Sequence, residues 1–232
     1  MVGRIICAAD GWVEAVRTLG PLLVGVVALL LSFYALAREL PVLAYGDQRS
    51  IDTTVALVQG DLGGAFSFYG QKRLMASCVQ GMTGGWSVLA PLEQRRTLAR
   101  NCLGHALSFA EATPVEALTW VVASRASFLL GNSEEMNRYF QYAWHAGPNE
   151  QWVAGLRVNL AQEAIGVLSD SNQRRHDSDL SVMVMSRNGI SAIAARYWSD
   201  QVFRDRITRI VEAMPPEDQR RFITSVRRAA MN

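Results

Sequence analysis

Residues that carry catalytic chemistry are scarce in this sequence and are not grouped. The three histidines, His105, His145 and His176, are separated by 40 and 31 residues. There is no C-x-x-C or H-E-x-x-H zinc motif, no G-x-S-x-G nucleophile elbow and no phosphate-binding glycine loop. Cys102 and His105 could share one helical face, but two ligands are too few for a zinc site. We therefore expect no catalytic residue, no metal and no cofactor. The sequence favours a binding protein rather than an enzyme.

Lysine and net charge are also low. Lys72 is the only lysine among 23 basic residues, and the formal net charge is +2. This balance gives no strong positive field of the kind that attracts nucleic acid. Nucleic acid is therefore excluded as a partner.

Charge is missing altogether from residues 18–37, which read TLGPLLVGVVALLLSFYALA. Twenty helical residues at a rise of about 1.5 Å each cross the hydrocarbon core of a bilayer. A signal peptide has a shorter apolar core and a small-residue cleavage site, whereas Arg38 and Glu39 follow this run. The sequence predicts an uncleaved, single-pass transmembrane helix over residues 18–37.

The basic residues that flank this span predict its orientation. Arg4, Arg17 and the amino terminus precede it, while Arg38 follows closely and Arg49 lies further away. The positive-inside rule then places residues 1–17 in the cytoplasm and the body in the periplasm of a bacterial inner membrane. The margin is one charge, so a reversed topology with a cytoplasmic adaptor remains the alternative.

Strand-like alternation is nearly absent after the span, and apolar residues recur at helical spacing. We therefore predict an all-α protein, in which the transmembrane helix is followed by stacked antiparallel helical hairpins and a C-terminal helical pair. The predicted division is a juxtamembrane connector over 38–50, a helical domain over 51–170, a polar hinge over 171–181 and the helical pair over 182–232.

Two residue types recur at an interval of 34. Trp86 and Trp120 are one such pair, and Pro114 and Pro148 are another. Within the second interval the pattern is Trp120, Gly131, Phe140, Ala143 and Pro148. This order resembles the tetratricopeptide repeat, a helix–turn–helix unit of about 34 residues. Two residues depart from it, because Ser124 replaces the usual glycine of the family and Met136 replaces its small alanine.

The resemblance covers residues 83–150, with one good unit and one degenerate unit that begins near Trp86. It implies a solenoid of stacked hairpins with a concave groove that binds peptides or helices of partner proteins. Tyr139, Tyr142 and Trp144 lie on the same predicted helix as Phe140 and cannot all face inward. They are the candidate partner-binding residues, since tyrosine and tryptophan are enriched at binding hot spots.

Cysteine use adds one conditional prediction. Cys78 and Cys102 lie equally far from residue 90, so they would stand at one level of an antiparallel hairpin. A periplasmic body permits a disulfide between them, and two buried free thiols are the alternative.

Residues 204–228 combine apolar stripes with seven arginines, which suits either a cap on the stack or a docking helix for a partner or anionic lipid. We expect a membrane-anchored periplasmic scaffold or regulator of a cell-envelope complex of the polysaccharide-assembly or secretion type. Its partners would be other envelope or inner-membrane proteins. The alternative is an accessory subunit held mainly by its transmembrane helix.

Overall fold

The computed structural model describes residues 3–44 and 51–231, which form helices joined by turns and short loops and contain no strand. The predicted all-α class is confirmed. The elements are α1 (Gly3–Ala44), α2 (Ile51–Gln59), α3 (Phe68–Thr83), α4 (Gly85–Leu89), α5 (Leu92–Ala112), α6 (Ala117–Leu129), α7 (Ser133–Ala146), α8 (Gln151–Glu163), the 3-10 helix η1 (Ile165–Val167), α9 (Asp170–Met185), α10 (Arg187–Ser199), α11 (Gln201–Glu212) and α12 (Pro216–Ala229).

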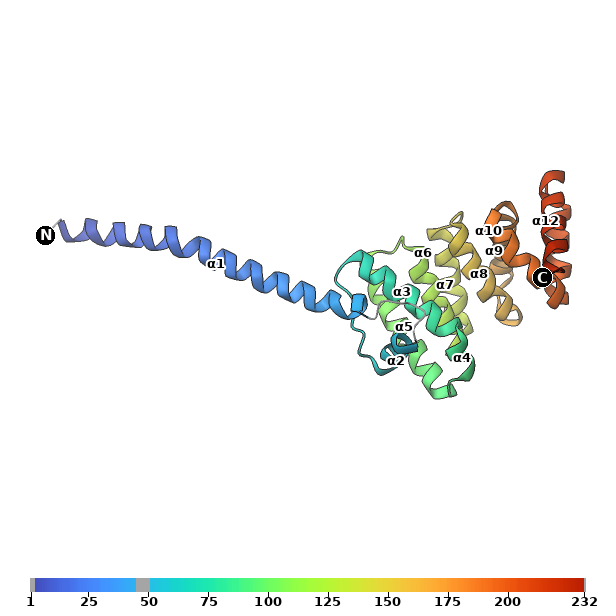
Figure 1. Cartoon of the computed structure of the whole chain (residues 1–232), viewed down its shortest axis with the longest axis horizontal. Helices are drawn as coiled ribbons and strands as arrows, with labels where there is room; N and C mark the ends of the chain where they lie inside the picture. The colour runs from blue at the N-terminus through green and yellow to red at the C-terminus, as the bar shows by residue number, and fades with distance from the viewer. Residues whose placement is uncertain (1–2, 45–50, 232) are drawn as a thin grey trace.

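Helix α1 projects away from the other helices as one long rod (Figure 1). The most apolar window of its segment Leu19–Ala44 has a mean hydropathy of 2.3 and buries nothing against the protein. By length and composition this segment can cross a membrane.

The predicted connector over 38–50 was wrong for its first half, because α1 continues through Ala44; residues 45–50 lie outside the described part of the chain. The helix continues past Arg38 because its end packs on the body. Val42 of α1 is buried in the hydrophobic cluster that also contains Leu74 of α3. The Glu39 carboxylate accepts hydrogen bonds from the Ser67 backbone N–H and hydroxyl.

The remaining helices follow one another along an elongated body that ends at α12 (Figure 1). Helices α5, α6 and α7 pack side by side, α8 packs on α9, and α10 packs on both α9 and α12. Among the described residues, apolar side chains form successive clusters along this body. Representative members are Leu74 and Leu98 near α1, Phe140 and Leu160 in the middle, and Phe203 and Phe222 at the far end.

The α6–α7 hairpin contains the better of the two predicted repeat units. Gly131 has a φ of +81° in the turn, a conformation that favours glycine, and the Asn132 side chain caps α7 by accepting from the Glu135 N–H. The two departures from the repeat pattern meet here, since the Ser124 hydroxyl donates to the Met136 carbonyl at 2.8 Å. A hydrogen bond thus satisfies the buried serine that replaces the small residue of the pattern.

The degenerate unit is not a hairpin of two comparable helices. Trp86 lies in α4, which has five residues and ends at Leu89. Ala90 is extended, as a residue that precedes proline tends to be, and α5 begins only after Pro91.

The predicted polar hinge over 171–181 was also wrong, since these residues lie within α9. Polar side chains on one face of α9 are buried and have partners on neighbouring helices. Asn172 donates to the Asn137 carbonyl at 2.8 Å, and Asp179 pairs with Arg157. The predicted C-terminal pair over 182–232 is in turn three helices, α10 to α12, that share a core with α9.

Candidate functional site: interaction surfaces

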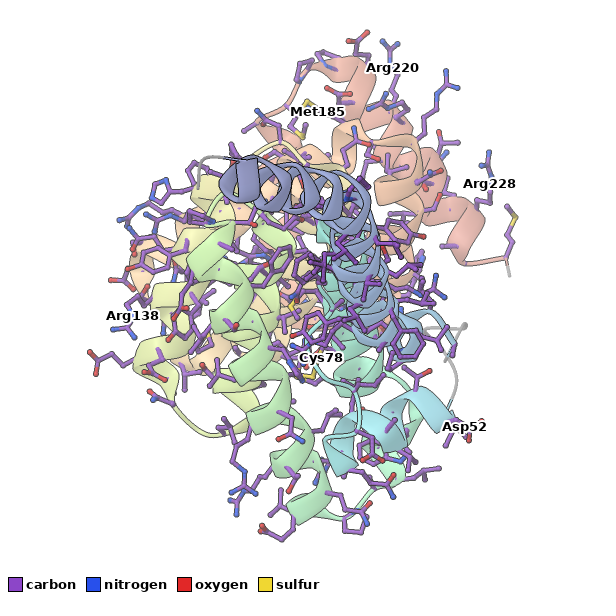
Figure 2. The ribbon with its side chains drawn as sticks, turned by 90° about the vertical axis from the view of Figure 1, so that its left-hand side faces the viewer. Asp52, Cys78, Arg138, Met185, Arg220 and Arg228 are labelled. Atoms are coloured by element: carbon purple, nitrogen blue, oxygen red, sulfur yellow. A yellow bond between two sulfur atoms is a disulfide. The ribbon has the colours of Figure 1, made fainter. Side chains whose placement is uncertain are left out.

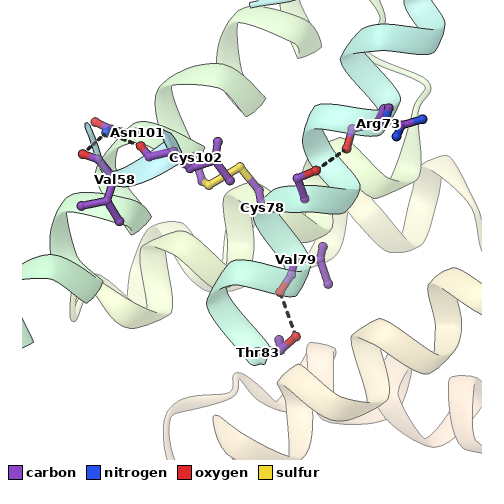
Figure 3. Close-up of a disulfide and its surroundings, with 9 residues drawn as sticks. Val58, Arg73, Cys78, Val79, Thr83, Asn101 and Cys102 are labelled. Carbon is purple, nitrogen blue, oxygen red and sulfur yellow. Dashed lines mark hydrogen bonds between the residues drawn. A yellow bond between two sulfur atoms is a disulfide. The ribbon is translucent and has the colours of Figure 1, made fainter. Parts of the chain in front are cut away.

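A disulfide joins α3 to α5 through Cys78 and Cys102 (Figure 3). The Cα atoms are 5.7 Å apart and both side chains are fully buried. Beside it, the Asn101 amide donates to the Leu57 carbonyl at 2.8 Å, which ties α2 to the same pair of helices. The structure therefore contains the predicted pairing. It also removes Cys102 from any metal site with His105, because a disulfide sulfur is no thiolate ligand.

An aromatic cluster lies where α6 meets α7. The Trp120 ring centroid is 5.9 Å from that of Tyr139 and 5.0 Å from that of Tyr142. Tyr139 is buried in this cluster and the Arg138 guanidinium lies over its outer face, 5.2 Å from the centroid. Tyr142 is 41% exposed, whereas Trp120 is half-buried.

Trp144, the third predicted partner-binding residue, lies apart from this cluster. Its ring is half-buried beneath the Arg175 guanidinium at 5.7 Å. The residues predicted to pack the repeat also differ in burial. Phe140 and Ala143 are fully buried, whereas Trp86, Trp120 and Pro148 are half-buried.

A cleft lined by arginines lies between α10 and α12 at the far end of the body. Its volume is about 530 Å³, and its lining includes Arg187, Arg220, Arg221 and Arg228 against the single carboxylate of Glu217. Figure 2 shows Arg220 and Arg228 projecting from α12 into solvent. The excess of positive charge and the exposed guanidinium groups suit a carboxylate-bearing ligand.

The four arginines of the cleft are not equally free. Arg221 donates to Asp218 at 2.8 Å and to the Val184 carbonyl at 3.0 Å, so it holds α12 against α9. Within the described residues, no side-chain hydrogen bond or ion pair holds Arg187 or Arg228. The sequence pointed to the arginines of α12, but Arg187 was missed because it belongs to α10 and reaches the cleft only in the folded chain.

The most buried charges serve packing. The Arg157 guanidinium, fully buried, donates to both Asp179 carboxylate oxygens at 2.8 and 2.6 Å and to the carbonyls of Ala143 and Gly147 at 3.1 Å each. These bonds join α7, α8 and α9 at one point. Burial raises the pKa of Asp179, and the hydrogen bonds and charge of Arg157 oppose this shift. No sequence motif marks this pair.

The buried His176 and the half-buried His105 have depressed pKa values. Burial, with smaller contributions from Arg206 and Arg196, lowers the pKa of His176 to about 3, and its Nε2 lies 2.9 Å from the Gln162 side-chain oxygen. Burial also lowers the pKa of His105, against a hydrogen bond with the Leu62 backbone. Among the residues that the structure describes, no three His, Cys, Asp or Glu side chains are grouped so that they could hold a metal ion.

No protein-family model, curated protein or solved structure matches this chain. The surfaces described above are therefore interpreted from their geometry and chemistry alone.

Proposed function

We propose that this protein is a membrane-anchored scaffold whose helical body binds partner proteins of the bacterial cell envelope. One observation carries the proposal: the chain joins an apolar helix, whose most apolar window is not buried against the protein, to a body made of stacked helices. Such a helix is stable only where lipid or another protein covers it. The body then stands at the membrane surface and presents its side chains to neighbouring proteins.

The tetratricopeptide-like interpretation belongs to this proposal. It is supported by the α6–α7 hairpin, with its glycine turn at Gly131 and buried Phe140 and Ala143. Helical repeats of this kind expose extended surfaces for peptide or helix recognition. We propose that the protein binds its partners through two such surfaces, one around Tyr142 and the other at the arginine-lined cleft.

A periplasmic location for the body is supported by two independent features. Structural disulfides persist in oxidising compartments, and the bond between Cys78 and Cys102 is buried. The basic residues Arg4 and Arg17 before the span favour a cytoplasmic N-terminus. An alkaline phosphatase fused after residue 232 should be active; a phosphatase-negative fusion whose fluorescent counterpart is bright would place the body in the cytoplasm and favour an adaptor.

We propose that the cleft between α10 and α12 holds an acidic segment of the partner. A photo-crosslinking amino acid at Thr224, which lines the cleft, should capture a protein through a peptide rich in Asp and Glu. Arg187→Glu with Arg228→Glu should abolish this crosslink by charge repulsion. Arg100→Glu, an exposed change on α5, is the matched control and should leave the crosslink intact. A crosslink that survives the double charge reversal, or that maps to a peptide without acidic residues, would argue against the cleft.

The second candidate function is an accessory subunit whose transmembrane helix is itself the contact. It is favoured by the open face of α1, where a Cβ at Gly25 would meet no other atom within 4 Å. Small residues allow close approach of a second helix in lipid. Replacing residues 18–37 with an unrelated apolar span separates the two functions, because a scaffold that acts through its body keeps its partners and an anchor-mediated subunit loses them.

A further inference from the structure

Three aromatic side chains remain exposed where the body meets α1. Phe66 and Tyr69 are 72% and 65% exposed, and Phe68 between them is 52% exposed although its ring packs edge-on against Phe109. They belong to the last residues of the α2–α3 loop and the first turn of α3. We call Phe66, Phe68 and Tyr69 the junction patch. Adjacent exposed aromatic rings usually mark a surface that something covers.

The position of the junction patch along α1 is set by direct contacts. The backbone N–H and hydroxyl of Ser67, in the middle of the patch, both donate to the Glu39 carboxylate, the hydroxyl at 3.0 Å. Val42, one turn further along α1, is buried in the first core cluster. The start of α3 therefore lies against the end of α1, as Figure 1 also shows.

Gly70 makes this close approach possible. A Cβ at Gly70 would lie 2.5 Å from a Glu39 carboxylate oxygen and 2.5 Å from the Ala65 Cβ. Any side chain there would push Glu39 away from the N-terminus of α3. The junction is thus a fitted contact between the membrane-spanning helix and the body, and not a chance approach of two segments.

The helical rise converts these contacts into a depth. Residues 18–37 span about 30 Å, the thickness of the hydrocarbon core. Glu39 is two residues beyond, at about 3 Å outside the hydrocarbon, and the headgroup layer on each side is roughly 5–8 Å thick. Because Ser67 touches Glu39, an α1 that crosses a bilayer over residues 18–37 would hold Phe66 and Phe68 at the level of the headgroups.

We propose that the junction patch inserts into the headgroup region of the same bilayer that α1 crosses. Tyrosine and phenylalanine are favoured at this depth, where an apolar ring meets the acyl boundary and a hydroxyl remains hydrated. The second contact holds the body in one orientation on the membrane. The inference rests on α1 being embedded, as in the proposed function.

The test is lipid quenching of a fluorophore on the full-length chain in phospholipid vesicles. In a Cys7→Ser background, single cysteines at Phe66→Cys and, separately, Tyr69→Cys are labelled with an environment-sensitive dye. Cys78 and Cys102 do not react while their disulfide is intact, so one dye per chain also reports that the body is folded. Phe68 is left unchanged because its ring packs on Phe109.

Two reference positions make the outcomes distinguishable. Val202→Cys, exposed on α11 at the far end of the body, reports water, and Leu30→Cys, in the middle of the span, reports hydrocarbon. Nitroxide on the lipid headgroup should quench the dye at 66 and 69 and leave the dye at 202 bright. If the dye at 30 is quenched by deep nitroxides while 66 and 69 behave like 202, the junction patch faces water or a protein and the inference fails alone. If the dye at 30 is also unquenched, the anchor and the inference fail together.

Discussion

Separating the buried Arg157–Asp179 pair should destabilise the body more than removing both partners. Asp179→Leu leaves a fully buried guanidinium with two carbonyl acceptors and no counter-charge. Removing one partner of a buried ion pair costs about 3–5 kcal/mol, because the remaining charge stays desolvated and unpaired.

The double change Arg157→Met with Asp179→Leu removes both charges and fills similar volume. The Gly147 carbonyl then loses its donor from Arg157, whereas the Ala143 carbonyl still accepts from the Gly147 N–H. One orphaned carbonyl costs about 1–3 kcal/mol. The double variant should therefore be more stable than Asp179→Leu alone, by roughly 2 kcal/mol.

Thermal unfolding of the full chain in detergent, followed by near-ultraviolet circular dichroism, measures this difference. Asp179→Leu should lower the Tm by about 6–20 °C, and the double variant should recover part of the loss. Arg96→Met is the control, because its partner Glu93 is exposed and such pairs contribute under about 1 kcal/mol. A double variant that unfolds as early as Asp179→Leu would refute the reasoning, since the loss would then come from packing and not from an unpaired charge.

Three further predictions concern the same body. Replacing Cys78 and Cys102 with serine opens a loop with a sequence separation of 24 and should reduce the free energy of unfolding by about 3.4 kcal/mol. Equal urea midpoints of the unsubstituted chain with and without reductant would contradict this. His176 is protonated less readily in the folded than in the unfolded state, so its contribution to stability is fully present above pH 6.5 and falls as the pH decreases toward 3. At pH 5 the free energy of unfolding should be lower by about 2 kcal/mol. His176→Gln should flatten this pH dependence when unfolding is measured at several pH values. Gly131→Ala should destabilise by about 1 kcal/mol because φ is +81°, whereas Gly104→Ala, within α5 and open around its Cβ, should raise the Tm slightly; equal Tm values would show that the turn tolerates a side chain.

The sequence predicted local structure well where the interactions that form it lie within a few residues of one another. The turn at Gly131 is of this kind. By itself, the order Thr113, Pro114 and Glu116 predicts a helix that begins after Thr113, because it is a capping-box pattern with proline in the first turn. In the structure Thr113 ends α5 and α6 begins after Glu116. Two groups outside the loop hold it: the Trp120 indole donates to the Pro114 carbonyl, and Lys72, with a sequence separation of 44, pairs with Glu116 at 3.3 Å.

Polar segments were predicted less well, for a related reason. Residues 171–181 carry many charged and amide side chains, which alone indicate a solvated hinge. In the folded chain Asn172, His176 and Asp179 are buried, since Asn137, Gln162 and Arg157 provide their partners. Each partner is at least 14 residues away, so no local pattern could reveal it.

The apolar span, the helical class and the level pairing of Cys78 with Cys102 followed from the sequence alone, because hydropathy, periodicity and spacing are properties of the chain itself. Tertiary structure alone decided which charges are buried, that α1 continues onto the body through Glu39 and Ser67, and that arginines from α10 and α12 share one cleft. The physical reason is that a polar group is buried only where folding brings a hydrogen-bond or ion-pair partner close to it. Neither segment contains that interaction by itself, so neither local sequence reveals it.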